Sequence, residues 1–347
     1  MSRPAYARIL VIQLRHVGDV LLTTPALHAL RRAFPAAVID FLVEPASRPV
    51  LARNADVDHV LVRGRGDSLW RGIRLLWRVR RNRYDLVVDY QHLVRTGLIA
   101  WCSGAALRLS YAHSLRRHLY TRTAAQPRAG YIARAKLALL RDAGVACPAA
   151  LDAQRPRMEV GAEARREVAR WLATQGSCDG RPLVSIDPMS RKGSRRWDGY
   201  AELADRLATD CGACVVFLWG PGARDRVEAL MAACRVPHLI APATDLEQLA
   251  ALIECCDLHV GNDSAPRHLA VARRTPSLTV VVQTEPETWT FPDRHHRTVC
   301  AAIGRDGSDA AAAAHRAALE QLVRDARELI AGGRGQPGAE APAAVAG

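Results

Sequence analysis

The clearest pattern of apolar and polar positions lies near the start of the chain. Residues 9–14 form a short, mainly apolar run that is typical of a buried parallel strand. Arg15, His16 and Gly18 end this run, and from Asp19 onward apolar residues recur at the spacing of a helical face. The stretch therefore predicts a strand that passes into a helix at Asp19, where open α/β sheets bind ligands. Two interpretations of Asp19 stay open here: a group of the ligand site, or an ordinary helix cap.

The rest of the first half alternates short apolar runs with amphipathic ones. Strands are expected at residues 38–43, 60–62 and 86–89, and helices at residues 69–79, 95–101 and 131–143. Gln91 and His92 directly follow the last of these strands, so they share with Asp19 a position at a strand's carboxyl end. Residues 108–131 are polar and basic and are expected to form a loop region that reaches over an acceptor. Residues 147–157 are expected to form a linker.

The second half repeats the alternation and ends in a tail. Helices are expected at residues 163–174, 197–207, 224–233, 246–253, 264–272 and 310–330, and strands at residues 183–186, 214–218, 238–240, 258–260 and 278–282. Residues 332–347 are rich in Gly, Ala and Pro and are expected to be disordered. The pattern predicts an α/β protein with two Rossmann-like domains, residues 1–150 and 151–331, facing each other across a cleft. A hydride-transferring dehydrogenase is disfavoured, because no G-x-G-x-x-G follows a first strand.

Charge is distributed unevenly between the halves. Residues 1–150 hold 24 basic and 9 acidic residues, a net charge of +15, whereas residues 151–347 hold 24 and 26, a net charge of −2. A basic half predicts an anionic partner: nucleic acid, a membrane surface or a phosphorylated glycolipid. Nucleic acid is disfavoured, because the arginine-rich segments match no known nucleic-acid-binding motif.

Several features favour a cytoplasmic protein without metal or cofactor. The sequence has no run of 18 apolar residues and no pattern of a secretory signal at its start. Its nine cysteines are scattered, which fits reduced thiols better than a disulfide framework. Cys211 and Cys214 have the C-x-x-C spacing but end a helix and lead into a strand, the reverse of a redox motif. No group of Asp, Glu and His has the spacing of metal ligands.

The expected helix at residues 69–79 combines bulky apolar residues with arginines. Its apolar stripe is formed by Trp70, Ile73, Leu76 and Trp77, and its arginines include Arg71, Arg74 and Arg78. One interpretation is a solvated polar face. The other is a helix that lies on an anionic membrane surface, since such helices pair aromatic residues with arginines.

Two stretches of the second half carry groups that suit a diphosphate. Residues 261–268 form a strand–loop–helix junction with Ser264 as the expected N-cap, and the free N–H groups of such a helix start bind phosphate. Asp263 is expected to brace this loop or to meet sugar hydroxyls. His268 is either a site residue or a core histidine bonded to a carbonyl. Residues 190–197 supply four cations after another strand, and these would neutralise a diphosphate leaving group.

Together these stretches resemble glycosyltransferase family 9, the ADP-heptose:lipopolysaccharide heptosyltransferases of Gram-negative bacteria. The resemblance is carried by residues 14–25, 190–197 and 261–268, and extends from about residue 8 to about residue 297. The first of these stretches is most similar to the heptosyltransferase III branch.

The resemblance implies a GT-B fold and an inverting, metal-independent transfer. The N-terminal domain then holds the acceptor and the C-terminal domain holds the nucleotide sugar, and Asp19 corresponds to the general base. The donor site is expected to include Ser190, Lys192, Arg195, Arg196, Gly220, Asp263, Ser264, Ala265 and His268. The acceptor site is expected to include Arg15, His16, Gly18, Arg71, Arg74, Arg78, Gln91, His92, Arg116 and Arg117. The expected partners are ADP-heptose, a phosphorylated lipopolysaccharide core and the anionic inner face of the inner membrane.

Three departures from the family pattern keep other functions open. Arg195 replaces the usual lysine, Ala265 replaces the usual glycine, and Gln283 with Thr284 replaces a common Gly-Pro. They leave as alternatives a transferase of another nucleotide sugar in cell-surface glycan synthesis, and a sugar-nucleotide epimerase or hydrolase on the same scaffold.

Overall fold

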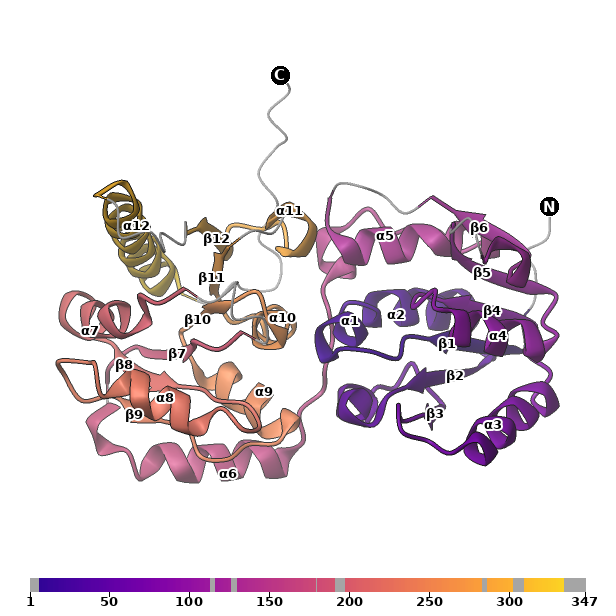
Figure 1. The fold of residues 1–347 in the computed structure, drawn as a ribbon, viewed down its shortest axis with the longest axis horizontal. Coiled ribbons are helices and arrows are strands. Elements are labelled where there is room, and N and C mark those ends of the chain that lie inside the picture. Colours follow the sequence, from indigo (N-terminus) through magenta and orange to yellow (C-terminus); the bar gives the residue numbers. More distant parts are fainter. Residues whose placement is uncertain are drawn as a thin grey trace, which may run out of the picture. The chain divides into compact units, whose positions relative to one another are not determined.

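The computed structural model describes residues 6–112, 116–125, 130–178, 180–190, 197–282, 286–301 and 309–333. Its contacts divide the chain into two compact units, Met1–Glu159 and Val160–Gly347. In each unit helices flank a parallel sheet of six strands (Figure 1). This is the predicted α/β architecture of two Rossmann-like units.

The sheet of the first unit has the strand order β3-β2-β1-β4-β5-β6. Its strands are β1 (Arg8–Ile12), β2 (Val38–Val43), β3 (His59–Val62), β4 (Leu86–Asp89), β5 (Leu107–Tyr111) and β6 (Arg122–Ala124). Its helices are α1 (Val17–Leu21), α2 (Thr24–Ala33), α3 (Leu69–Arg81), α4 (Val94–Ser103) and α5 (Ile132–Leu139), with the 3-10 helices η1 (Pro45–Leu51), η2 (Arg117–Leu119), η3 (Leu140–Ala143) and η4 (Leu151–Gln154). The central strands β1 and β4 are covered on both faces, with α3 and α5 on opposite sides of the sheet (Figure 1).

Two predictions for the first unit are wrong. The helix expected after Asp19 is two helices, α1 and α2, with Pro25 among the first residues of the second. The loop region expected at residues 108–131 contains strands in its described part: most of β5 and all of β6 lie there and extend the sheet beyond β4. The side chains of Leu109 and Tyr111 are buried there, although arginines surround them in the sequence.

The linker expected at residues 147–157 belongs to the first unit. η4 packs against α2 and α5, and the N–H of Arg157 donates to Thr24 Oγ1 over 2.7 Å. These contacts explain why the division between the units falls after Glu159 rather than at residue 150.

The sheet of the second unit has the order β12-β11-β10-β7-β8-β9, which repeats the order of the first when the strands are counted from β7. Its strands are β7 (Leu183–Asp187), β8 (Cys214–Phe217), β9 (Leu239–Ile240), β10 (Leu258–Asn262), β11 (Ser277–Val281) and β12 (His296–Cys300). Its helices are α6 (Ala162–Ala173), α7 (Tyr200–Asp210), α8 (Arg224–Met231), α9 (Leu246–Cys255), α10 (Ala265–Arg273), α11 (Pro286–Trp289) and α12 (Asp309–Gly332), with the 3-10 helix η5 (Gly176–Cys178). The sequence patterns did not predict β12 or α11. Residues 334–347 of the expected tail lie outside the described residues.

Packing in the second unit places helices on both sides of the strands. α7 packs against α12, whereas α9 packs against α6 and α10, and Figure 1 shows α12 and α6 on opposite sides of the sheet. Trp197, Tyr200 and Leu322 lie in the core between α7, α12 and the strands. The sulfur atoms of Cys178 and Cys214 lie side by side, with their Cα atoms 5.3 Å apart.

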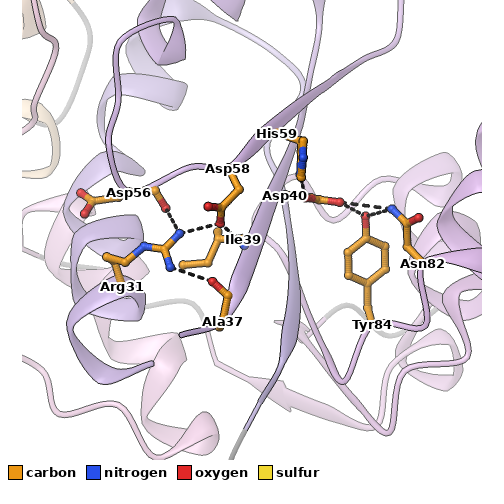
Figure 2. A network of polar contacts seen from close by, with 9 residues as sticks. All are labelled: Arg31, Ala37, Ile39, Asp40, Asp56, Asp58, His59, Asn82 and Tyr84. Carbon is orange, nitrogen blue, oxygen red and sulfur yellow. Dashed lines mark hydrogen bonds and ion pairs between the residues drawn. The ribbon is translucent and has the colours of Figure 1, made fainter. Parts of the chain in front are cut away.

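Buried polar contacts fix the edge of the first sheet (Figure 2). Asp40 in β2 is 1% exposed, accepts hydrogen bonds from Tyr84 and Asn82, and pairs with His59 Nδ1 over 2.9 Å. A second network of hydrogen bonds joins α2 to β2 and to the start of β3; it is formed by Arg31, Ala37, Ile39, Asp56 and Asp58. The Asp40 carboxylate is thus occupied by structural bonds and is no candidate for the functional site. Among the described residues, no helix is long and apolar enough to cross a membrane.

Candidate active site

Each sheet has one point at which the chain reverses the direction of strand addition. In the first unit it lies between β1 and β4, and in the second between β7 and β10. Open α/β sheets bind ligands at the carboxyl ends of the strands that flank this point. In both units the polar residues predicted for the site follow these strands.

Asp19 lies in α1, directly after β1. The N-cap of this helix is His16, and no side chain caps it, so the interpretation of Asp19 as a helix cap is wrong. His16 has a φ of 61°, in the left-handed region that a non-glycine residue rarely adopts. The strained turn at His16 thereby directs the chain into α1, and the Asp19 side chain is half-buried at the carboxyl end of β1.

Gln91, which follows β4, holds the loop that precedes Asp19. Its side-chain oxygen accepts hydrogen bonds from the backbone N–H groups of Leu14 and Arg15 over 3.1 and 2.8 Å, and from the Gln13 side chain over 3.1 Å. The next residue, His92, has a φ of 41°. The structure thus brings predicted residues together at the carboxyl ends of β1 and β4, where Gln91 holds the loop in place: Arg15, His16, Gly18, Asp19, Gln91 and His92.

Sequence reasoning missed Lys136 in α5. Its side chain is 4% exposed, and its Nζ donates to Gln13 Oε1 over 2.7 Å and to Thr23 Oγ1 over 2.9 Å. The third acceptor is the backbone carbonyl of Asp19 at 3.4 Å. Burial lowers the pKa of Lys136 to about 8, although the negative charge of Asp19 raises it. The signal in the sequence was composition, because only two of the 48 basic residues are lysines.

The remaining acceptor candidates lie elsewhere on the first unit. Arg71, Arg74 and Arg78 lie on the exposed part of α3. Arg116 and Arg117 lie at the start of η2. This 3-10 helix is tied to β5, because the carbonyl of Leu119 accepts a hydrogen bond from the Arg108 side chain over 3.1 Å. These five arginines lie on other elements than the loop that carries Asp19.

Asp187 and Ser264 join the two central strands of the second unit. Ser264 is the N-cap of α10 by position, as predicted, but its hydroxyl donates to Asp187 Oδ2 over 2.7 Å and accepts no hydrogen bond from the N–H groups of the helix. Asp187 also accepts from the N–H of Met189 over 3.3 Å. Burial raises the pKa of Asp187 to about 6. The first N–H groups of α10, beginning at Ala265, therefore have no side-chain cap and suit a phosphate.

Two buried side chains beside this helix start have polar atoms without a hydrogen-bond partner among the described residues. Asn262 is 1% exposed, and neither its amide nitrogen nor its amide oxygen has a partner among the described residues. His268 is 4% exposed with Nδ1 unpaired within the same set, so the expected bond to a carbonyl is absent at that nitrogen. Burial, and then the charge of Arg267, keep the pKa of His268 well below its ordinary value. Buried polar groups are nearly always paired, so unpaired ones at a strand's carboxyl end indicate a place for ligand atoms.

Asp263 braces the loop, as predicted. Its carboxylate accepts from Arg267 Nη1 over 2.8 Å, and the same guanidinium donates to Thr290 Oγ1 over 2.8 Å. Thr290 contacts Thr298 of β12 over 2.7 Å, so this chain of bonds ties the start of α10 to the sheet edge. Asp263 is thereby occupied by a cation of its own unit.

Other predicted donor residues are only partly described. Ser190 is half-buried after β7, and Gly220 is exposed after β8. Lys192, Arg195 and Arg196 lie outside the described residues, as do Gln283 and Thr284, at which the sequence departs from the family pattern.

One group of possible metal ligands occurs in the described part of the chain, formed by Asp205, Cys234 and His238. It lies before β9, at the amino end of a strand, whereas the site lies at carboxyl ends. The Asp205 carboxylate already accepts from two backbone N–H groups and pairs with His238 Nε2 over 3.0 Å. These bonds explain the cluster as a structural clamp.

Each unit has the strand order of a Rossmann fold and carries polar groups at its reversal point. The chain therefore has a GT-B fold, a class of α/β proteins. A glycosyltransferase family 9 protein from Veillonella parvula has this fold with a TM-score of 0.80 and 22% identity, covering 95% of this chain and 99% of that one. The Escherichia coli ADP-heptose lipopolysaccharide heptosyltransferase II matches with a TM-score of 0.75 and 21% identity, covering 94% and 99%.

The sequence comparison defines the family within this class. The model of glycosyltransferase family 9 (heptosyltransferase) matches residues 73–311, so the chain belongs to that family and is a glycosyltransferase. Lipopolysaccharide heptosyltransferase 3 of E. coli K12 is 28% identical over 291 residues, covering 80% of this chain and 83% of that protein. The family match begins within α3, so the role of Asp19 stays a prediction.

Proposed function

We propose that this protein transfers heptose from ADP-heptose to the phosphorylated inner core of lipopolysaccharide, with inversion and without a metal ion. Family membership and the names of its relatives support the heptose donor and the lipopolysaccharide acceptor. The observation that carries the mechanism is the difference in side chains at the two reversal points. The first presents the carboxylate of Asp19, and the second presents the start of α10 beside Asn262 and His268, which have buried polar atoms without partners among the described residues.

In this mechanism Asp19 accepts the proton of the acceptor hydroxyl as that oxygen attacks the anomeric carbon of the heptose. The bond between the anomeric carbon and the diphosphate breaks, and ADP leaves on the opposite face, which inverts the configuration. The helix start at Ala265 stabilises the charge that develops on ADP, together with Lys192 and Arg195. Metal independence is part of this proposal, because cationic side chains and the helix start would meet the charge on ADP in place of a metal ion. A chelator should therefore leave the rate unchanged.

The acceptor side includes a surface for an anionic membrane. Trp70 and Trp77 on α3 are 74% and 73% exposed, and Leu69 beside them is 79% exposed. α4, which packs along α3, adds the exposed side chains of Val94, Leu98 and Trp101. An open cavity of about 950 Å³ next to Trp77 is lined by Arg80, Arg81 and Arg83. Exposed tryptophans bordered by arginines suit the interface of anionic lipids.

Vesicle flotation tests this surface. Replacing Trp70, Trp77 and Trp101 by Ser should abolish flotation with vesicles that contain phosphatidylglycerol, whereas Trp171→Ser on α6 of the second unit should leave it unchanged. Wild-type protein should not float with vesicles of phosphatidylcholine alone. Equal flotation of the triple variant and the wild type would contradict the membrane surface.

The lipopolysaccharide core of a deletion strain tests the transfer itself. Mass spectrometry should show a core that lacks one heptose, and a plasmid copy of the wild-type chain should restore it. Loss of a hexose would identify another nucleotide sugar as the donor. An unchanged core, with rapid turnover of ADP-heptose in the absence of acceptor, would favour an epimerase or hydrolase.

A further inference from the structure

Lys136 is a buried charged group that the proposed mechanism does not use. It lies in α5, which packs against α2, and its side chain is 4% exposed. Of the chain's 48 basic residues only Lys136 and Lys192 are lysines. The ammonium of a lysine is compact, whereas the guanidinium of an arginine is planar and larger.

The contacts of Lys136 meet at the backbone of Asp19. In the turn between α1 and α2 the N–H of Thr23 donates to the carbonyl of Val20, so it does not bond to the carbonyl of Asp19 as a continuous α-helix would require. Two side chains satisfy the Asp19 carbonyl instead: the hydroxyl of Thr23 at 2.7 Å and Lys136 Nζ at 3.4 Å. The same Nζ bonds to the Thr23 hydroxyl and to Gln13, which is itself held by Gln91.

We propose that Lys136 is a positioning residue for Asp19: its ammonium fixes the Asp19 carbonyl and both flanking segments, and so aims the Asp19 carboxylate. This inference rests on the proposed function, in which Asp19 accepts the proton. The three N–H donors of the ammonium match three acceptors, those of Gln13, Thr23 and Asp19. A neutral amine has two N–H donors and leaves one acceptor unpaired.

The surroundings of Lys136 link this arrangement to pH. The ammonium faces the charge of Asp19 from α1, the ring of Tyr90 at 5.0 Å and the neutral groups of Gln13 and Thr23. Because burial lowers its pKa to about 8, the third donor is lost as the pH rises through 8. We therefore expect kcat to fall above pH 8. The contribution of Lys136 to stability has the opposite sign: the unfolded state binds more protons than the folded state between pH 8 and 10.5, so stability rises with pH in that window.

Kinetics of Lys136→Met test the positioning role. We expect kcat to fall on the order of 10²-fold, the cost of a misplaced reacting group, with both KM values unchanged. The fall in kcat above pH 8 should disappear in this variant. The matched control is Tyr90→Phe, which removes the bond from the Tyr90 hydroxyl to the Lys136 carbonyl (3.0 Å) but keeps the amine. It should lower thermal stability and leave the pH profile of kcat unchanged. A wild-type kcat for Lys136→Met would overturn the inference.

Nuclear magnetic resonance gives a readout that needs no activity. In protein with isotope-labelled lysine only two side-chain amines give signals, and Lys136→Met assigns them. Asp19→Asn should lower the pKa of the Lys136 amine, because the charge of Asp19 raises it. An unshifted titration would overturn the contact between the two residues. Failure of heptose transfer by the wild type would refute the proposed function. The titration would still decide whether Lys136 contacts Asp19, because it needs no activity.

Discussion

The two reversal points share a topology but differ in the state of their polar side chains. Around Asp19, the side chains of Gln13, Thr23, Gln91 and Lys136 bond to one another or to the loop backbone. In the second unit the amide of Asn262 is buried and unpaired within the described part of the chain. The loop that carries Asp19 is therefore held by these side chains before any ligand binds, whereas the amide of Asn262 is left to bond to a ligand.

This difference indicates a division of labour between the units. A reacting group needs a fixed position, because catalysis depends on the orientation of the atoms that react. A binding site for a polar ligand gains affinity when its buried groups find their partners in the ligand. The first point thus suits proton transfer, and the second suits recognition of the nucleotide.

The largest effect is expected at Asp19. Asp19→Asn keeps the size of the side chain but removes the base, so kcat should fall by about 10²–10⁴-fold. The KM for ADP-heptose should stay near its wild-type value. Rates from a coupled assay of ADP release check this, and near-normal transfer by Asp19→Asn would refute its role as the base.

A smaller effect is expected from the exposed cations of α3. Reversing Arg71, Arg74 and Arg78 to Glu should raise the KM for acceptor in anionic vesicles on the order of 10²-fold, since each basic residue contributes about 1 kcal/mol near such a surface. Raising salt should weaken acceptor binding in the wild type as well, because exposed charges are screened over about 8 Å at physiological ionic strength. The affinity for ADP should hardly change. Reversal of Arg166 and Arg170 on α6, which are also exposed, is the control.

Weakened ADP binding with a normal acceptor KM in the α3 variant would reverse the assignment of substrates to the two units.

A further effect concerns stability at the reversal point of the second unit. The pKa of Asp187 is raised from 3.8 to about 6 in the folded protein, so its ionisation costs stability as the pH rises from 4 to 6. Asp187→Asn keeps an acceptor for Ser264 and removes this cost, so it should raise the free energy of unfolding at pH 7 by up to about 3 kcal/mol, with no gain at pH 3. Urea unfolding at both pH values measures it.

Asp263→Asn is the contrasting variant, because it leaves the buried Arg267 without its charge partner. It should lower stability at pH 7. If Asp187→Asn also lowers stability, the ionised Asp187 carboxylate must make favourable contacts that outweigh the cost of its burial.

The sequence was most informative where one physical effect dominates. The strands Val38–Val43 and Leu86–Asp89 match the predictions residue for residue, since a doubly covered strand must be apolar. The β5–β6 region was mistaken for a loop because its arginines mask the buried Leu109 and Tyr111. The helix after Asp19 was predicted as one because apolar spacing does not show that the Asp19 carbonyl bonds to side chains instead.

The candidate site was predicted by position rather than by contact. Local pattern placed Asp19 and Ser264 at strand ends, and the structure confirms these positions. No local pattern reveals that Ser264 bonds to Asp187, 77 residues earlier, or that Lys136 reaches the Asp19 carbonyl across 117 residues. Such partners are set by the fold, because strands far apart in sequence become neighbours only in the sheet.

Calorimetric binding of ADP to two variants side by side tests the division of labour most directly. Asp19→Asn should bind ADP with the wild-type Kd, because the proposed role of Asp19 is to act on the acceptor. Asn262→Leu should weaken ADP binding on the order of 10-fold, since a bond to a buried amide contributes about 1–3 kcal/mol, and should fold normally because the amide is unpaired in the described structure. Weak binding by Asp19→Asn together with wild-type binding by Asn262→Leu would contradict the account.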